Sequence, residues 1–321
     1  MRLLLRFESY TTSCLKTRIS CIHWNYNSVQ LSPRQFAEAL GVSESSVRRW
    51  ADSGKICMSR TAGGHRKIAR AEAIRFIRET ASQLAKPELL GIVEPANRRD
   101  RAQAFLSQHE VLHSALEAGD SGKVAALLQS MYVNGVTVAE IFDGPVRQAM
   151  RRIGEKWPAD KRGIFLEHRA TNICIDAISA LRNELPPPRK TAPLALGGAP
   201  ESDPYILPSL MAATVFADIG LETLNLGPNT PMDVMVQSAI EMKARIVWIA
   251  LTAPLPRKNV ELELQTLARK LNSKKIDLVL GGQSLGRYQI PTSSRVHGFQ
   301  SLAEMVGFAR SFVKQKRRAA V

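Results

Sequence analysis

The sequence predicts a multidomain α and α/β protein with a winged helix-turn-helix, a four-helix cap bundle and a five-stranded doubly wound (flavodoxin-like) parallel sheet. Three observations support this fold class. Two short capped helices and a glycine turn lie between residues 31 and 69, four helical patterns span residues 98–185, and apolar runs alternate with amphipathic stretches from residue 194. A chain of 321 residues has room for about two or three domains.

The composition is that of a folded, basic protein. Hydrophobic side chains make up 45% of the residues and charged ones 23%, which excludes disorder as the main state. Lys and Arg number 44 against 29 Asp and Glu, so the net charge of +15 attracts polyanions such as nucleic acid or an anionic membrane surface. No run of 18 apolar residues occurs, and the four cysteines form no Cys-x-x-Cys pair. We therefore expect a cytoplasmic protein without membrane spans, a disulfide framework or a zinc knuckle.

The first ordered elements are two short helices joined by a tight turn. Residues 1–28 lack sustained periodicity and are expected to form a disordered leader. Ser32 is placed to cap a helix that ends at Gly41, and Ser43 to cap a second helix that ends at Gly54. This arrangement predicts a helix-turn-helix.

A β-hairpin and a third helix complete this domain. Residues 55–61 and 65–68 read as two strands joined by a turn at residues 62–64, which predicts a wing. A helix then starts near Arg70, and its expected inward side chains are Ile74, Ile77 and Leu84.

The predicted wing and second helix present basic and short polar side chains suited to DNA. A recognition helix needs such groups to reach base edges, and a wing can reach phosphates. Arg49 is the foremost candidate for reading a base. The segments Val47–Trp50, Gly54–Ile56 and Arg60–Arg66 resemble the MerR-type winged helix-turn-helix family; a basic hairpin in a protein–protein module stays the alternative. The expected DNA-binding residues are Ser45, Ser46, Arg48, Arg49, Lys55, Arg60, His65 and Arg66.

Two further domains follow the winged head. Four helices are expected at about 99–118, 121–133, 137–155 and 163–184, and a proline run at Pro186–Pro188 ends the last of them. The expected strands are Leu194–Leu196, Leu221–Leu226, Ile246–Leu251, Ile276–Leu280 and Arg295–Val296. We expect a leader at 1–28, the DNA-binding domain at 29–86, a linker at 87–97, the bundle at 98–186, the α/β domain at 191–316 and a basic tail at 317–321.

A Trp-x9-Glu-His spacing lies in the predicted bundle. Together with the winged head and the α/β domain, it resembles the CarH/LitR group of cobalamin-dependent, light-responsive repressors. In that group the bundle covers the upper face of cobalamin. The resemblance implies that Trp157, Glu167 and His168 lie over that face.

The predicted α/β domain matches the cobalamin pattern of that group only in part. The resemblance implies cofactor contacts from Gly227, Thr252, Gly281 and Gly282. The position of the lower cobalt-ligating His, however, is Pro204, and proline cannot bind cobalt. Cobalamin is therefore an uncertain cofactor: a corrinoid held in another mode, a cofactor-free interaction module and a different ligand all stay open.

Two other positions depart from the cobalamin pattern of that group. Leu207 replaces the glycine of the lower loop, and Pro158 follows the tryptophan where light-responsive members carry a His.

A literal His-Glu-x-x-His at His109–His113 has no third ligand at the spacing of the known metallopeptidases, so no metal site is expected. His297 is interpreted as a packing residue at the sheet edge, with a substitute cobalt ligand as the alternative.

These features predict a DNA-binding transcription regulator rather than an enzyme. Its expected partners are double-stranded DNA and further copies of itself, because heads of this kind read paired half-sites. No membrane partner is expected. The alternative is a corrinoid-carrier or methyltransferase component, which would share the bundle and the α/β domain but has no need of a winged head.

Overall fold

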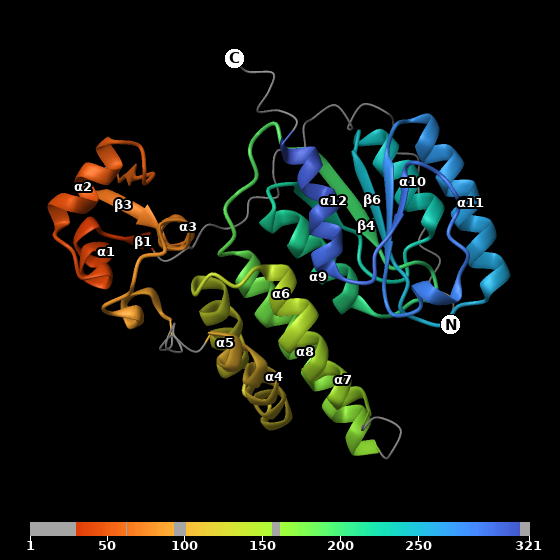
Figure 1. Ribbon diagram of the computed structural model, residues 1–321, viewed down its shortest axis with the longest axis horizontal. Coiled ribbons are helices and arrows are strands. Elements are labelled where there is room, and N and C mark those ends of the chain that lie inside the picture. Colours follow the sequence, from red (N-terminus) through yellow and green to blue (C-terminus); the bar gives the residue numbers. More distant parts are fainter. Residues whose placement is uncertain (1–29, 62, 93–100, 156–160, 315–321) are drawn as a thin grey trace, which may run out of the picture.

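The computed structural model describes residues 30–61, 63–92, 101–155 and 161–314, and it confirms the predicted fold class (Figure 1). A small winged head, a helical bundle and an α/β domain follow one another along the chain. The bundle lies between the head and the α/β domain. Within the described residues, no helix has the length and apolar character needed to cross a bilayer. The expected leader falls outside these residues.

The head combines three helices with a small antiparallel sheet of order β1-β3-β2. The strands are shorter than predicted, because the backbone at Cys57 bonds to the side chain of Glu72 instead of to a neighbouring strand. Leu84 lies beyond the third helix. The elements are β1 (Gln30–Leu31), α1 (Pro33–Leu40), α2 (Glu44–Asp52), β2 (Ser59–Arg60), β3 (Arg66–Ala69), α3 (Arg70–Thr80) and the 3-10 helix η2 (Pro87–Leu90).

An aromatic cluster holds the head together. Phe76 of α3 lies 6.0 Å from Phe36 of α1 and 4.8 Å from Trp50 of α2, measured between ring centroids. The predicted caps are present: Ser32 accepts a hydrogen bond at the start of α1, and Gly41 ends that helix with a φ of 68°. The aromatic contacts fix the angle between the two helices of the helix-turn-helix.

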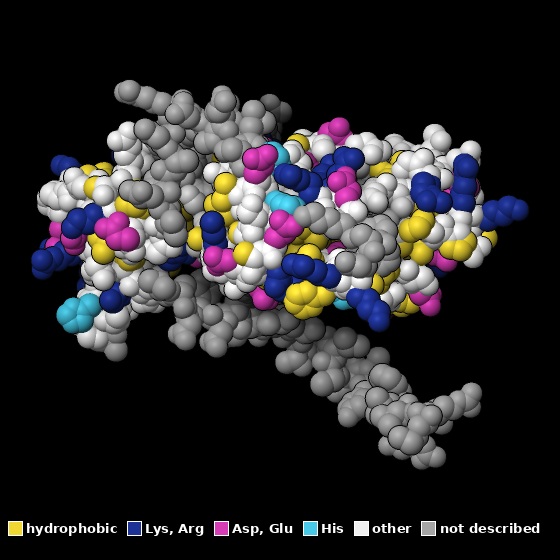
Figure 2. Space-filling view, turned by 90° about the horizontal axis from the view of Figure 1, so that it is seen from below, with side chains coloured by type: hydrophobic (Ala, Val, Ile, Leu, Met, Phe, Trp, Pro, Cys, Tyr) yellow, Lys and Arg dark blue, Asp and Glu magenta, His cyan; other side chains and the backbone are white. Residues whose placement is uncertain are grey.

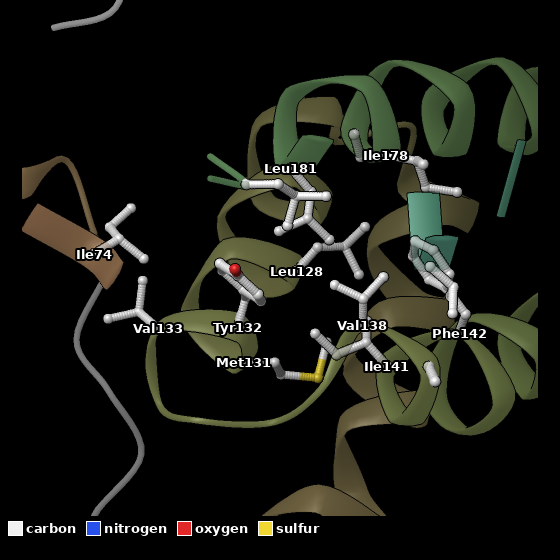
Figure 3. Packing of buried hydrophobic residues seen from close by; sticks show 14 of the residues in the cluster. Ile74, Leu128, Met131, Tyr132, Val133, Val138, Ile141, Phe142, Ile178 and Leu181 are labelled. Carbon is white, nitrogen blue, oxygen red and sulfur yellow. The ribbon is translucent and has the colours of Figure 1, made fainter. Parts of the chain in front are cut away.

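The bundle contains the expected helical segments with one irregularity. The segment predicted as a continuous helix over 137–155 is divided by a π-helical turn, because Pro145 has no N–H to donate to the carbonyl of Ile141. Figure 3 shows apolar side chains of α5, α6 and α8 meeting in the core, among them Leu128, Val138 and Ile178. The elements are α4 (Arg101–Ala118), α5 (Ser121–Val133), α6 (Val138–Ile141), η4 (Phe142–Val146), α7 (Arg147–Glu155) and α8 (Lys161–Arg182).

The α/β domain is a five-stranded parallel sheet of order β5-β4-β6-β7-β8. Helices α9 and α12 cover one face, and α10 and α11 cover the other (Figure 1). The strand order reverses beside β4, so the carboxyl ends of β4 and β6 form the expected ligand edge. The elements are β4 (Leu194–Gly198), α9 (Ile206–Asp218), β5 (Glu222–Asn225), α10 (Met232–Glu241), β6 (Ile246–Ala250), α11 (Arg257–Ser273), β7 (Asp277–Gly281), η5 (Leu285–Arg287), β8 (Val296–Gly298) and α12 (Leu302–Lys314).

The bundle and the α/β domain cap each other's helices. In the π turn, the carboxylate of Asp143 accepts the N–H groups of Leu302 (3.1 Å) and Ala303 (2.9 Å) at the start of α12. In the opposite direction, Asp218 at the end of α9 accepts the N–H of Val138 at the start of α6. Because N–H groups at a helix start have no partner within the helix, these two contacts stabilise both helices and join the two domains.

We predict that Asp143→Ala lowers the free energy of unfolding by about 1–2 kcal/mol, the usual effect of losing a helix N-cap. Urea unfolding followed by circular dichroism measures this. The matched control is Asp176→Ala, which removes an exposed carboxylate from α8 and should change stability by less than about 0.5 kcal/mol. Equal stability of the two variants would contradict the capping role.

Candidate functional site

Helix α2, which the sequence predicts to be the recognition helix, carries serines at its start. The Ser43 hydroxyl accepts the N–H of Ser46 at 3.3 Å, and it lies 2.8 Å from the hydroxyl of Ser45 and 3.0 Å from that of Ser46. Val47 is fully buried and faces the head core. The two predicted base-contacting serines therefore also stabilise the first turn of the helix.

The two arginines of α2 differ in their freedom. Arg48 pairs with Glu44 one turn earlier, at 2.8 Å, on the exposed side of the helix. Arg49 is exposed as well, and no ion pair joins it to another described residue. The side chain of Arg49 is thus the more available of the two for a base edge.

The wing is a tight hairpin with basic side chains. The N–H of Thr61 donates to the carbonyl of His65 at 2.9 Å, and Gly64 adopts a φ of 79°, a conformation that glycine accepts without strain. Arg60 and His65 are exposed, whereas Arg66 is half-buried and pairs with Asp52 of α2 at 3.3 Å. Arg66 therefore links the wing to α2 in addition to adding positive charge.

Figure 2 shows Lys and Arg side chains and a histidine on the outer part of the head, among acidic side chains. The predicted DNA-binding residues all lie on α2, on the wing or on the loop between them. Figure 1 places α2 on the outer side of the head, away from the bundle.

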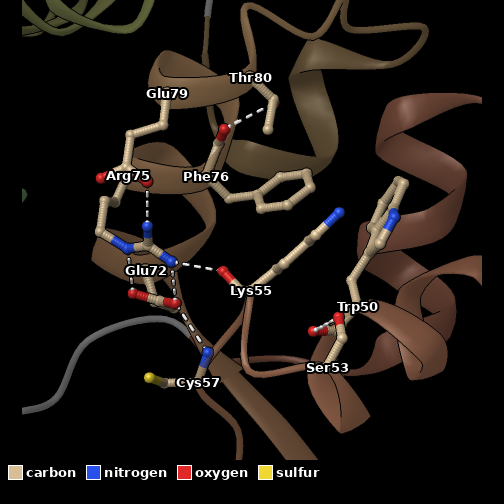
Figure 4. A network of polar contacts seen from close by, with 9 residues as sticks. All are labelled: Trp50, Ser53, Lys55, Cys57, Glu72, Arg75, Phe76, Glu79 and Thr80. Atoms are coloured by element: carbon tan, nitrogen blue, oxygen red, sulfur yellow. Dashed lines mark hydrogen bonds and ion pairs between the residues drawn. The ribbon is translucent and has the colours of Figure 1, made fainter.

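A polar network that the sequence patterns did not predict holds the loop between α2 and the wing in place (Figure 4). Arg75 donates to both carboxylate oxygens of Glu72 at 2.7 and 2.6 Å, to Glu79 and to the carbonyl of Lys55 at 2.8 Å. Glu72 in turn accepts the N–H of Cys57 at 2.7 Å. The bonds to Glu72 raise the pKa of Arg75, so this guanidinium stays charged. The i,i+3 and i,i+4 spacing of these residues on α3 was the only sequence signal for the network.

The carboxyl edge of the α/β sheet is closed by a buried carboxylate, that of Asp203. One of its oxygens accepts the N–H groups of Thr252 (2.6 Å) and Ala253 (2.9 Å), and the other accepts the N–H of Tyr205 at 3.1 Å. The carbonyl of Asp203 accepts the N–H of Asn229 at 3.1 Å. Asp203 therefore ties together the loops that follow β4, β5 and β6, and its side chain is fully buried at this edge.

The residues of this edge do not fit a corrinoid whose cobalt is bound by a protein imidazole from below. Pro204 is exposed beside the buried Asp203. A Cβ atom on Gly282 would lie 2.3 Å from the carbonyl oxygen of Leu251, so this glycine is required by close backbone packing. Two features still leave room for a ligand: a Cβ on Gly281 would make only an ordinary contact of 3.7 Å, and the buried Thr252 hydroxyl has no hydrogen-bond partner among the described residues.

The other predicted contacts of this site are distributed as follows. Gly227 has a φ of 82° in the loop after β5, and a Cβ atom at this position would meet no other atom within 4 Å. His297 lies in β8, where its Nε2 is 3.0 Å from Asp277 at the amino-terminal end of β7, and its ring packs 4.1 Å from Phe308. His297 therefore faces away from Pro204, as expected of a packing residue.

On the bundle, Glu167 and His168 lie near the start of α8. Glu167 accepts the hydroxyl of Thr171 at 3.1 Å, and the side chain of His168 is 71% exposed. Trp157 and Pro158 fall outside the described residues. Phe165, on the same turn, is exposed as well, so this end of the bundle presents apolar and polar groups to solvent.

The His-Glu-x-x-His sequence lies on α4 and does not build a metal site. His113 is buried, and its Nδ1 is 3.4 Å from Glu117 one turn later. Among the residues that the structure describes, no group of three or more His, Cys, Asp or Glu side chains is arranged to hold a metal ion. The geometry offers no support for a metallopeptidase.

Two protein families match parts of the chain. Residues 31–81 match a helix-turn-helix domain, and residues 108–182, which belong to the bundle, match a B12 binding domain. The chain therefore combines a helix-turn-helix domain with a B12 binding domain. A search of curated proteins returns no match.

Several solved structures are similar to part of the chain at low sequence identity. The monomethylamine corrinoid protein of Methanosarcina barkeri is 19% identical, with a TM-score of 0.48 over 64% of this chain and 98% of that one. A cobalamin-binding protein of Desulfitobacterium hafniense is 16% identical, with a TM-score of 0.32 over 64% and 98%. The methanol:cobalamin methyltransferase complex of Methanosarcina barkeri is 11% identical, with a TM-score of 0.34 over 69% and 86%.

We predict that Glu72→Ala frees the loop before the wing, because the Cys57 N–H loses its acceptor and Arg75 loses its main partner. The expected cost is about 1–3 kcal/mol in the local stability of this loop. Amide hydrogen exchange measures it locally: the protection of Cys57 should fall while that of Phe36 in α1 is kept. Unchanged protection at Cys57 would show that the network does not order the loop.

Proposed function

We propose that the protein is a transcription regulator that binds DNA through a MerR-type winged head and performs no catalysis. The observation that carries this proposal is the exposed Arg49, which forms no ion pair with the described residues, on a capped helix with the basic wing beside it. The helix-turn-helix match over residues 31–81 supports DNA binding. A corrinoid carrier, the alternative, has no use for this surface.

The geometry supports different roles in DNA binding for α2 and for the wing. α2 enters the major groove, where Arg49 donates two hydrogen bonds to the O6 and N7 atoms of a guanine. Arg60 and His65 of the wing and Lys55 contact phosphates, which adds affinity without sequence information. Arg66 keeps the wing at a fixed distance from α2 through Asp52. We expect a cytoplasmic homo-oligomer, since paired heads read paired half-sites.

The bundle and the α/β domain form the sensing half of the proposed regulator, as in the CarH/LitR group. The B12 binding match over residues 108–182 supports a corrinoid that contacts the end of the bundle at Glu167 and His168. Since Pro204 offers no imidazole and the carboxylate of Asp203 is bonded to the N–H groups of Thr252 and Ala253, neither residue would supply a protein ligand to the cobalt of a bound corrinoid. The same closure by Asp203 favours a second candidate, a cofactor-free interaction module.

The DNA contacts predict two different responses to alanine substitution. Arg49→Ala should cost about 1–3 kcal/mol and relax the preference at one base pair, whereas Lys55→Ala should weaken all sequences alike and reduce the salt slope by about 1. Mobility shifts on the protein's own promoter measure both. Arg269→Ala removes an exposed charge from α11 and serves as the control. If both head variants bound as tightly as the control, another surface would read the DNA.

The sensing half predicts a distinctive cobalamin spectrum. Adenosylcobalamin that stays with the protein through desalting should keep the visible spectrum of the free, base-on cofactor, because no side chain displaces the benzimidazole. Glu167→Ala should reduce the retained amount. A base-off spectrum of the histidine-ligated type would contradict the proposed mode, and complete loss of cobalamin on desalting would favour the cofactor-free module.

A further inference from the structure

Helix α3 packs against the head core with one face and contacts the bundle with another. Phe76 and Ile77 point into the head core, where Phe76 contacts the aromatic rings of α1 and α2. Arg70, Ile74 and Arg78 are spaced four residues apart and therefore form a stripe on the other face. Figure 3 shows Ile74 opposite Val133 at the end of α5. This second face joins the head to the bundle.

The first end of the stripe is a buried guanidinium. Arg70 is only 8% exposed; it forms an ion pair with Glu184, which follows α8, and donates to the carbonyl of Leu90 at 2.7 Å and to Gln129 of α5 at 3.4 Å. Burial lowers the pKa of Arg70. A buried charge is tolerated only while its partners stay in place, so this contact defines one arrangement of head and bundle.

The other end of the stripe caps the carboxyl terminus of α5. Arg78 donates to the carbonyls of Tyr132 and Val136, the second at 3.1 Å, and its guanidinium lies 3.8 Å from the centre of the Tyr132 ring. Carbonyls at a helix end carry partial negative charge, which favours a cation. The hydroxyl of Tyr132 in turn donates a hydrogen bond to Asp218 of the α/β domain at 3.4 Å. Arg78 of the head therefore contacts the bundle directly, and it reaches the α/β domain through the buried side chain of Tyr132.

The docked head leaves its DNA-reading surface free. In Figure 1, α3 lies between the rest of the head and the bundle, while α2 lies on the outer side. Docking thus does not block DNA, but it fixes the direction in which α2 points relative to the bundle. In an oligomer, that direction decides where two recognition helices can meet two half-sites.

We propose that Arg70 and Arg78 are specificity-determining positioning residues that set the half-site spacing this protein reads. The inference rests on the proposed function, since it concerns how the head is presented to DNA. Two rigidly held heads bind together only when the half-sites match their separation, and the gain from the second contact is lost when geometry forbids it. Heads released from the bundle would tolerate many spacings.

The test compares one half-site with pairs of half-sites. The half-site is taken from nuclease protection of the protein's own promoter, and the paired duplexes vary the spacer in single base-pair steps over one helical turn of about 10 base pairs. Affinities are measured for the full chain and for Arg78→Gln and Glu184→Gln, which disturb opposite ends of the stripe. Lys123→Gln, an exposed charge at the start of α5, is the matched control. Thermal unfolding confirms that each variant is folded.

The parent and the control should prefer one spacing over the worst by about 100-fold, the lower range of gain from two-site binding. Both stripe variants should bind the single half-site within about twofold of the parent yet lose most of this preference. A parent-like spacing profile in both variants, or a parent without any preference, would overturn the inference. A parent that fails to bind the single half-site would overturn the proposed function itself.

Discussion

Charged side chains at helix ends hold the three parts of this protein together. Asp143 of the bundle caps α12, Asp218 of the α/β domain caps α6, and Arg78 of the head caps the end of α5. Helix termini carry unpaired N–H or C=O groups wherever they occur, so each terminus offers a directional contact to a neighbouring domain. Apolar contacts such as that of Ile74 with Val133 add buried apolar area, but the caps determine which helix ends lie against which neighbouring domain.

Burial of Asp218 shows how these contacts depend on one another. Desolvation raises the pKa of this carboxyl, while the positive charge of Arg78 and the N–H of Val138 act in the opposite direction. The charge on Asp218 is thus stabilised by groups from the two other parts of the molecule. The head, bundle and α/β domain are linked electrostatically as well as by packing, which is the arrangement a sensor needs if its state is to reach the DNA-binding surface.

Most of the fold follows from periodicity and end signals in the sequence, whereas the long-range polar contacts do not. The capped helices at Ser32 and Ser43 and the five strands were predicted because local patterns determine them. Asp203 was missed because its acceptor role involves backbone N–H groups some 50 residues away, which leave no pattern. The contacts of Arg70 and Arg78 were not predicted either, since nothing local shows that a second domain covers that face of the helix.

Selection of binding sites from random DNA duplexes tests the sequence-specific reading by the winged head most directly. At physiological salt, repeated selection by the full chain should converge on paired half-sites, each with a conserved guanine opposite Arg49. The Arg49→Ala protein should enrich the same sites without that guanine. Failure of the parent to enrich any sequence, with binding that disappears uniformly as salt rises, would contradict the account, because the basic head would then be a general polyanion-binding surface.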